Sequence, residues 1–168
     1  MKKIIYLIPF IIIALASCES PKEKKIKQIQ KLEVNDSMFS PKRLEDLKVA
    51  YLDFAGKYPD DERSPDYLSK ASQVCMALGQ SDYAIQLLQT VIDQYPKSKK
   101  SEEALFRQGY LYENNLQNLV KAKNAYQEFL KKYPNSELAK DAKFSLENLG
   151  KSPEELFNVI TNKKDSAS

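Results

Sequence analysis

Apolar residues recur every three or four positions along most of the chain after residue 43, which is the spacing of amphipathic helices. The clearest example runs from Ala84 to Pro96 and ends at a proline, which a helix does not readily continue through. No useful stretch after the N-terminal leader alternates as a strand does. The pattern therefore predicts an all-α protein. Its helices are expected at about residues 43–57, 66–79, 82–94, 101–114, 119–132, 136–149 and 153–161.

The helical segments repeat at a nearly fixed interval. Tyr58-Pro59, Tyr95-Pro96 and Tyr133-Pro134 each end a segment, and their tyrosines are 37 and 38 residues apart. A period of this length is typical of stacked helical hairpins. Ala84 and Ala122 hold matching positions, where the second helix of a pair should cross close to the first. We expect an array of antiparallel helix pairs with about six or seven helices.

The two ends of this array differ from its middle. The first unit shows only a second helix, with Leu47, Tyr51 and Phe54 before Pro59, and no clear first helix. The last unit shows only a first helix, and a capping helix is expected after Ser152, which suits an N-cap position.

Residues 18–42 are polar and rich in lysine. Ile26, Ile29 and Leu32 recur every three residues, so a short helix is expected at about 23–34. Two interpretations are open. The segment is either a basic spacer that contacts anionic lipid headgroups, or a solvated linker whose few apolar residues cap the first repeat.

The N-terminus has the parts of an export signal. Lys2 and Lys3 precede an apolar run from Ile4 to Leu15, which is shorter than the roughly 20 residues that span a bilayer as a helix. The run ends in Leu-Ala-Ser-Cys18, which resembles the lipobox of bacterial lipoproteins. This resemblance implies cleavage before Cys18 and a diacylglycerol on its sulfur. The alternative is an ordinary secretory signal with a chance cysteine.

The lipobox also bears on location. Glu19 follows the cysteine, and by resemblance to enteric lipoproteins the absence of Asp there favours an outer-membrane anchor facing the periplasm of the bacterial envelope. The expected organisation is a signal peptide at 1–17, a lipidated tether at 18–42, repeats at 43–150, a capping helix at 151–162 and a disordered tail at 163–168.

The repeated pairs resemble the tetratricopeptide repeat over roughly residues 44–150. Unit two would cover about 65–96 and unit three about 102–134, with Gly109 at a close helix contact and Ser72 where Gly is usual. The resemblance implies a right-handed array of antiparallel helix pairs.

The segment that follows the third tyrosine is similar to a narrower group. The pattern Tyr126-x-x-Phe129-Leu130-x-x-Tyr133-Pro134-Asn135-Ser136-x-x-Ala139-x-x-Ala142 is similar to bacterial envelope proteins. These include the lipoprotein of the outer-membrane β-barrel assembly machine and the periplasmic coordinator of cell division.

Composition argues against several kinds of chemistry. The chain has no His to serve as base or metal ligand, and its four Gly do not form a phosphate-binding loop. The net charge of +3 lacks the basic excess of a nucleic-acid-binding surface. We therefore expect no catalysis, no cofactor, no metal and no nucleic acid. Cys75 is expected to be a small buried side chain.

In tetratricopeptide proteins the first helices of successive units line a groove that binds peptides. Mapping this groove onto the chain gives candidate partner-binding residues at Gln73, Phe106, Tyr110, Glu113 and Phe144. Phe106 and Tyr110 are one helical turn apart, on the face opposite the expected core stripe. The alternative is that both pack on a neighbouring helix.

These observations predict a membrane-anchored, non-catalytic adaptor that binds envelope proteins or peptides, with outer-membrane protein assembly as one candidate process. The alternatives are an accessory lipoprotein that captures glycan or peptide ligands, and an adaptor of cell division or cell-wall synthesis.

Overall fold

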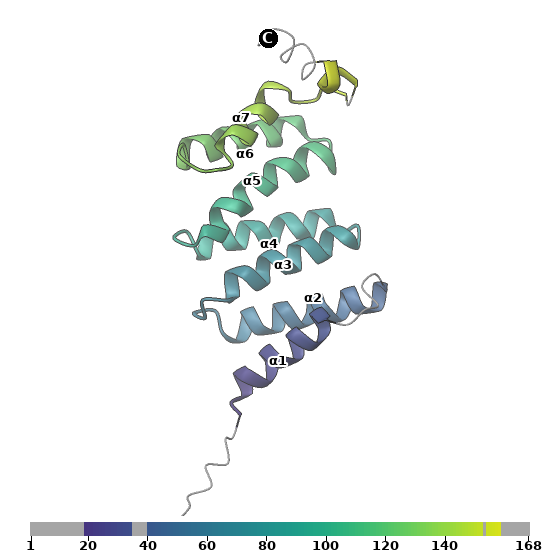
Figure 1. Ribbon diagram of the computed structural model, residues 1–168, viewed down its shortest axis with the longest axis vertical. Helices are drawn as coiled ribbons and strands as arrows, with labels where there is room; N and C mark the ends of the chain where they lie inside the picture. The colour runs from purple at the N-terminus through teal and green to yellow at the C-terminus, as the bar shows by residue number, and fades with distance from the viewer. Residues whose placement is uncertain (1–18, 35–39, 153, 159–168) are drawn as a thin grey trace, which may run out of the picture.

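The computed structural model describes residues 19–34, 40–152 and 154–158, and within these ranges the chain is helical and contains no strand. The helices lie across the long axis of the molecule and stack in chain order, from α1 at one end to α7 at the other (Figure 1). Each helix packs against its neighbours in the chain, and α3 also packs against α5. The helices are α1 (Pro21–Val34), α2 (Pro41–Lys57), α3 (Ser64–Ala77), α4 (Ser81–Gln94), α5 (Lys99–Asn114), α6 (Leu119–Lys132) and α7 (Ala139–Glu147).

Helix α1 corrects the expectation that unit one lacks a first helix. Its Ile29 is only 1% exposed and belongs to the common hydrophobic core, with Ile26 and Leu32 packed beside it. The Arg43 guanidinium of α2 donates a hydrogen bond to the Leu32 carbonyl at the end of α1, with Nε at 2.8 Å. The apolar residues of 21–34 therefore cover the end of the array, as the second interpretation of this segment held, but the segment is a packed helix and not a solvated linker. The short helix expected at about 23–34 is thus present, but its spacing did not show that it pairs with α2 as the first helix of unit one.

The three Tyr-Pro pairs are structurally equivalent ends. Tyr58, Tyr95 and Tyr133 have φ of −130°, −126° and −128° and ψ of 58°, 50° and 56°. Each donates its backbone N–H to the carbonyl four residues earlier. The Tyr95 hydroxyl also donates to the Pro59 carbonyl at 2.9 Å, which connects the turns of successive units. The repeat period read from the sequence is thus confirmed by backbone geometry.

Close contact between the two helices of a unit depends on matched side-chain sizes. Ala84 and Ala122 are fully buried at the predicted crossing points. In unit three, a Cβ added to Gly109 would lie 2.6 Å from Cε1 of the buried Tyr126 ring, so glycine is required there. In unit two the corresponding residues are Ser72 and the smaller Leu88.

Helix α7 begins later and ends earlier than the predicted 136–149. Residues 136–138 form a turn instead, in which the Ser136 hydroxyl accepts from the Leu138 N–H at 3.0 Å. The predicted terminal helix is helical at 154–158, and Ser152 accepts the Glu155 N–H as an N-cap should. The rest of that prediction, 159–161, lies outside the described residues.

None of the helices in the described part of the chain is long and apolar enough to cross a bilayer. The predicted signal peptide at 1–17, Cys18 and the tail at 163–168 lie outside the described residues, and these assignments stay predictions.

The Gly109 contact leads to a stability prediction. Gly109→Ala gains helix propensity of about 1 kcal/mol but overpacks the Tyr126 ring, which costs about 1–3 kcal/mol, so we expect a net loss of unfolding free energy. Gly56→Ala is the matched control, because a Cβ there meets no atom within 4 Å. Urea unfolding followed by circular dichroism would measure both. An equal or higher stability of Gly109→Ala would contradict the close contact.

The turn between units one and two predicts a pH dependence. The Arg63 guanidinium donates to the Asp61 carboxylate at 2.7 and 2.8 Å, and Lys22 of α1 lies 3.1 Å from it. The hydrogen bond from Arg63 is the main cause that lowers the pKa of Asp61 well below its ordinary value. The ionised Asp61 carboxylate therefore stabilises the fold above its unfolded-state pKa of about 3.9. This stabilisation is lost as the pH falls through the pKa of Asp61 in the folded state.

Asp61→Asn should thus lower the melting temperature at pH 7 and flatten its decline below pH 4. The exposed neighbour Asp60 provides the control, Asp60→Asn. Parallel melting curves of wild type and Asp61→Asn across this pH range would argue against the assignment.

Candidate partner-binding groove

Salt bridges connect the first helices of units one, two and three. Glu33 of α1 pairs with Lys70 of α3 at 2.9 Å, and Lys70 also pairs with Asp66 at 3.3 Å. Lys100 of α5 then pairs with Asp66 at 3.2 Å and with Glu103 at 3.0 Å. We call this set of five residues the charge chain. Each of its two lysines and three carboxylates already has a partner of opposite charge, so none of the five is an unpaired contact for a ligand.

A tyrosine fills the space between the first helices of units one and two. The Tyr51 hydroxyl of α2 donates to the Glu33 carboxylate at 2.9 Å. Its ring stacks on Tyr67 of α3, with 5.5 Å between ring centroids. Burial is the main reason that the pKa of the Tyr51 hydroxyl is raised, so this group remains a hydrogen-bond donor. Tyr51 therefore joins α1 to α3.

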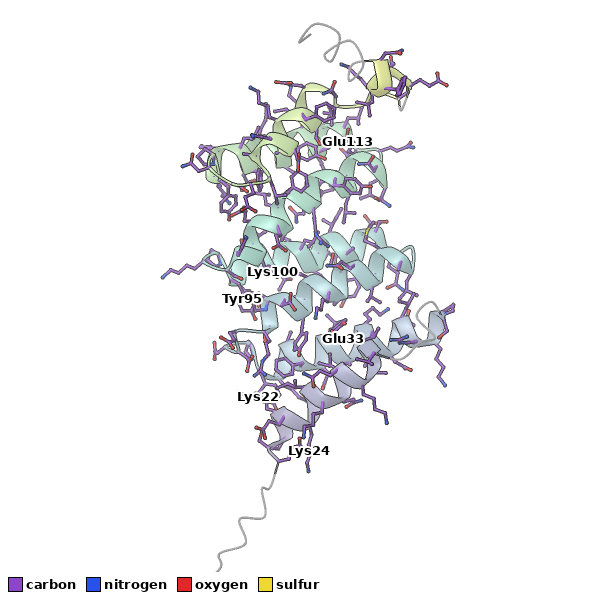
Figure 2. All side chains as sticks on the ribbon, viewed as in Figure 1. Lys22, Lys24, Glu33, Tyr95, Lys100 and Glu113 are labelled. Carbon is purple, nitrogen blue, oxygen red and sulfur yellow. The ribbon has the colours of Figure 1, made fainter. Side chains whose placement is uncertain are left out.

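A second tyrosine does the same between units three and four. The Tyr126 hydroxyl of α6 donates to the Glu113 carboxylate of α5 at 2.9 Å, and Ser145 of α7 lies beside this hydroxyl. Of the two carboxylates that receive these bonds, Glu113 lies near one end of the stack and Glu33 lies further along it, above Lys22 and Lys24 in the view (Figure 2). The pair of tyrosine–glutamate contacts is thus a repeated feature of units one and three.

Unit two lacks this contact, and a pocket lies in its place. Leu88 holds the position of Tyr51 and Tyr126, and Met76 holds that of Glu113. Between α3 and α5 there is a pocket of about 280 Å³, which we call the α3–α5 pocket. Its lining residues are Ser72, Gln73, Met76, Leu88, Arg107, Tyr110 and Leu111. In the other two units a tyrosine ring fills the gap between the first helices of successive units. The shorter Leu88 side chain leaves this gap, which we call the seam, open.

Two side chains of α5 border this pocket toward solvent. Tyr110 is 52% exposed, which is unusual for a large aromatic side chain on a packed helix. Arg107 is partly buried, and to the described residues it forms neither an ion pair nor a side-chain hydrogen bond. Arg107 also lines a second pocket of about 360 Å³, between α5 and the turn that leads into α7, which we call the α5–α7 pocket. The other residues that line the second pocket are Lys99, Glu102, Glu103, Phe106, Glu137 and Leu138.

The structure brings two of the five sequence-predicted residues together at one site. Gln73 and Tyr110 face each other across the α3–α5 pocket. Phe106 instead packs on α6, 5.9 Å from Tyr126 and 5.7 Å from Phe129 between ring centroids, which is the alternative the sequence left open. Glu113 is bonded to Tyr126, and Phe144 lies half-buried on α7, one unit further along.

Sequence reasoning did not identify Arg107, Leu88, Ser72 and Leu111 as residues that line the α3–α5 pocket. A signal for one of them was present, because aligning the repeat units places Leu88 where the other two units have tyrosine. Arg107 gives no such signal. Only the structure shows that Lys100, and not Arg107, takes the carboxylate of Glu103.

The described residues offer no group of three or more metal-ligating side chains. Cys75 is fully buried, and burial raises the pKa of its thiol, which disfavours the nucleophilic thiolate.

Comparison with known proteins supports the repeat assignment. The family model of the tetratricopeptide repeat matches residues 73–98 and 103–136. The matched segments contain the end of α3, all of α4, most of α5, all of α6 and two of the Tyr-Pro turns. No curated protein shows significant similarity to the chain. Repeats of this family typically form non-catalytic scaffolds that bind other proteins.

Proposed function

We propose that this tetratricopeptide-repeat chain is a non-catalytic scaffold that binds a partner protein at the α3–α5 pocket, while a lipid on Cys18 holds it at a bacterial membrane. The observation that carries the proposal is the open seam of unit two beside the exposed Tyr110. Large aromatic side chains of this kind are enriched among the residues that dominate protein–protein binding energy.

The size of the pocket favours a peptide segment over a small ligand. Small-molecule sites usually enclose about 300–1,000 Å³. The α3–α5 pocket, at about 280 Å³, lies at the lower limit of this range and has room for one large side chain of a longer partner. This favours the adaptor over the alternative of an accessory lipoprotein that captures glycans.

The proposed anchor would lie close to the array. Only Glu19 and Ser20 separate Cys18 from the first residue of α1. Three residues span at most about 10 Å, so a lipid on Cys18 would keep α1 against the headgroups. We place the protein at the periplasmic face of the outer membrane, where outer-membrane protein assembly is the leading process and cell division the alternative.

Partner binding is tested by photo-crosslinking in intact cells. A photoreactive amino acid at Gln73 should form an adduct with the partner, whereas one at Tyr83, which is 40% exposed on α4, should not. Tyr110→Ala should lower the adduct at Gln73 about tenfold, because truncating an interface anchor commonly costs 1–2 kcal/mol or more. Tyr83→Ala is the matched control. An adduct that persists in Tyr110→Ala would refute the groove as the binding surface.

The anchor is tested by metabolic labelling with an alkyne fatty acid in a bacterial host. Wild type should incorporate the label and sediment with membranes, and Cys18→Ser should do neither. Cys75→Ala, at a buried thiol, should retain both properties. Label retained by Cys18→Ser would disprove lipidation at this residue.

A further inference from the structure

We infer that the occupant of the groove is an extended peptide with a large apolar side chain for the α3–α5 pocket and an Asp or Glu side chain nearby for Arg107. The inference rests on the proposed function and specifies the chemistry of the partner.

Arg107 differs from the two lysines of the charge chain. Lys70 and Lys100 each have two carboxylate partners in the charge chain. Arg107 is partly withdrawn from water and forms no ion pair to the described residues, since Glu103 bonds Lys100 instead. A guanidinium binds a carboxylate through two parallel hydrogen bonds. None of the described carboxylates bonds Arg107, so its guanidinium is available to a carboxylate of the ligand.

The pocket itself indicates the neighbouring residue of the ligand. In units one and three a tyrosine contacts the first helices on both sides of the seam, α1 and α3 for Tyr51 and α5 and α7 for Tyr126, and in unit two the same seam is open. Its wall is formed by Met76, Leu88 and Leu111, with the Tyr110 ring at the rim. A leucine or phenylalanine side chain of the partner would fill the space that Leu88 leaves.

The carboxylates that line the α5–α7 pocket limit the ligand to a single acidic side chain. Beyond Arg107 the surface carries Glu102, Glu103 and the exposed Glu137. A run of acidic residues would be repelled there, whereas a neutral or basic continuation would not. Because Arg107 lines pockets on both of its sides, we assign the carboxylate to a side chain within the peptide rather than to a chain end.

The test uses the purified full chain in lipid nanodiscs and fluorescein-labelled peptides of twelve residues in a glycine–serine background. The first set holds a central leucine or phenylalanine and a glutamate one to three positions away on either side. Two matched sets replace the glutamate by glutamine or the apolar residue by serine. Fluorescence anisotropy should show at least one glutamate peptide that binds about tenfold tighter than its glutamine partner. Arg107→Gln should abolish this difference in affinity between the glutamate and glutamine peptides.

A second variant addresses the pocket. Ser72→Gly with Leu88→Tyr reproduces the Gly109–Tyr126 pair of unit three and should fill the seam. The double variant should keep its helical circular dichroism and lose about tenfold in affinity for the best peptide. If it fails to fold, Met76→Ser removes apolar contact from a partly exposed wall and should weaken binding in the same direction.

The outcomes separate this inference from the proposed function. If no peptide binds but the Gln73 crosslink still captures a partner, the groove stands and the ligand chemistry is wrong. Equal affinity of glutamate and glutamine peptides, or a ratio that survives Arg107→Gln, overturns the role of Arg107. Unchanged affinity in the filled-pocket or Met76→Ser variant overturns the apolar site. If neither peptides nor crosslinks are found, both proposals fail.

Discussion

The whole array depends on how closely the two helices of each unit approach each other. Where Gly109 allows it, the Tyr126 ring lies against the first helix, and its hydroxyl reaches Glu113. In units one and three the tyrosine at this position also contacts the first helix of the next unit, so one side chain contributes both to the pairing within a unit and to the stacking between units. In an array whose units contact only their neighbours, such contacts are the main source of cooperativity.

Periodicity made most of the fold predictable. Local spacing and side-chain size determine the helix positions, the Tyr-Pro ends and the buried alanines. Both properties follow directly from the amino-acid sequence. Helix α1 was harder, because its few apolar residues are isolated among lysines and only packing on α2 shows which of them are buried. The groove was harder still. Phe106 and Tyr110 have similar sequence signals, but only the structure shows that Phe106 packs on Tyr126 and that Tyr110 is left exposed.

Unit two is thus both the most ordinary repeat in sequence and the exception in structure. Its leucine suits the core of a helix pair as well as a tyrosine does, but it is too short to reach the next first helix. The consequence is a gap flanked by an arginine that has no counter-ion among the described residues. The charge chain beside it shows the opposite arrangement, in which every charge is already matched.

The order of the stack also decides how mechanical load would pass through the molecule. With an anchor at Cys18 and a partner at the α3–α5 pocket, tension between membrane and partner would run through α1, α2 and α3 and bypass α6 and α7. This path holds the Lys25–Asp53 and Lys22–Asp61 ion pairs, the Arg43 hydrogen bond to α1 and the Tyr51–Glu33 contact. These interactions join groups that are far apart in the sequence and support the segment between the anchor and the groove. A force applied to the partner would therefore act on several interactions at the same time.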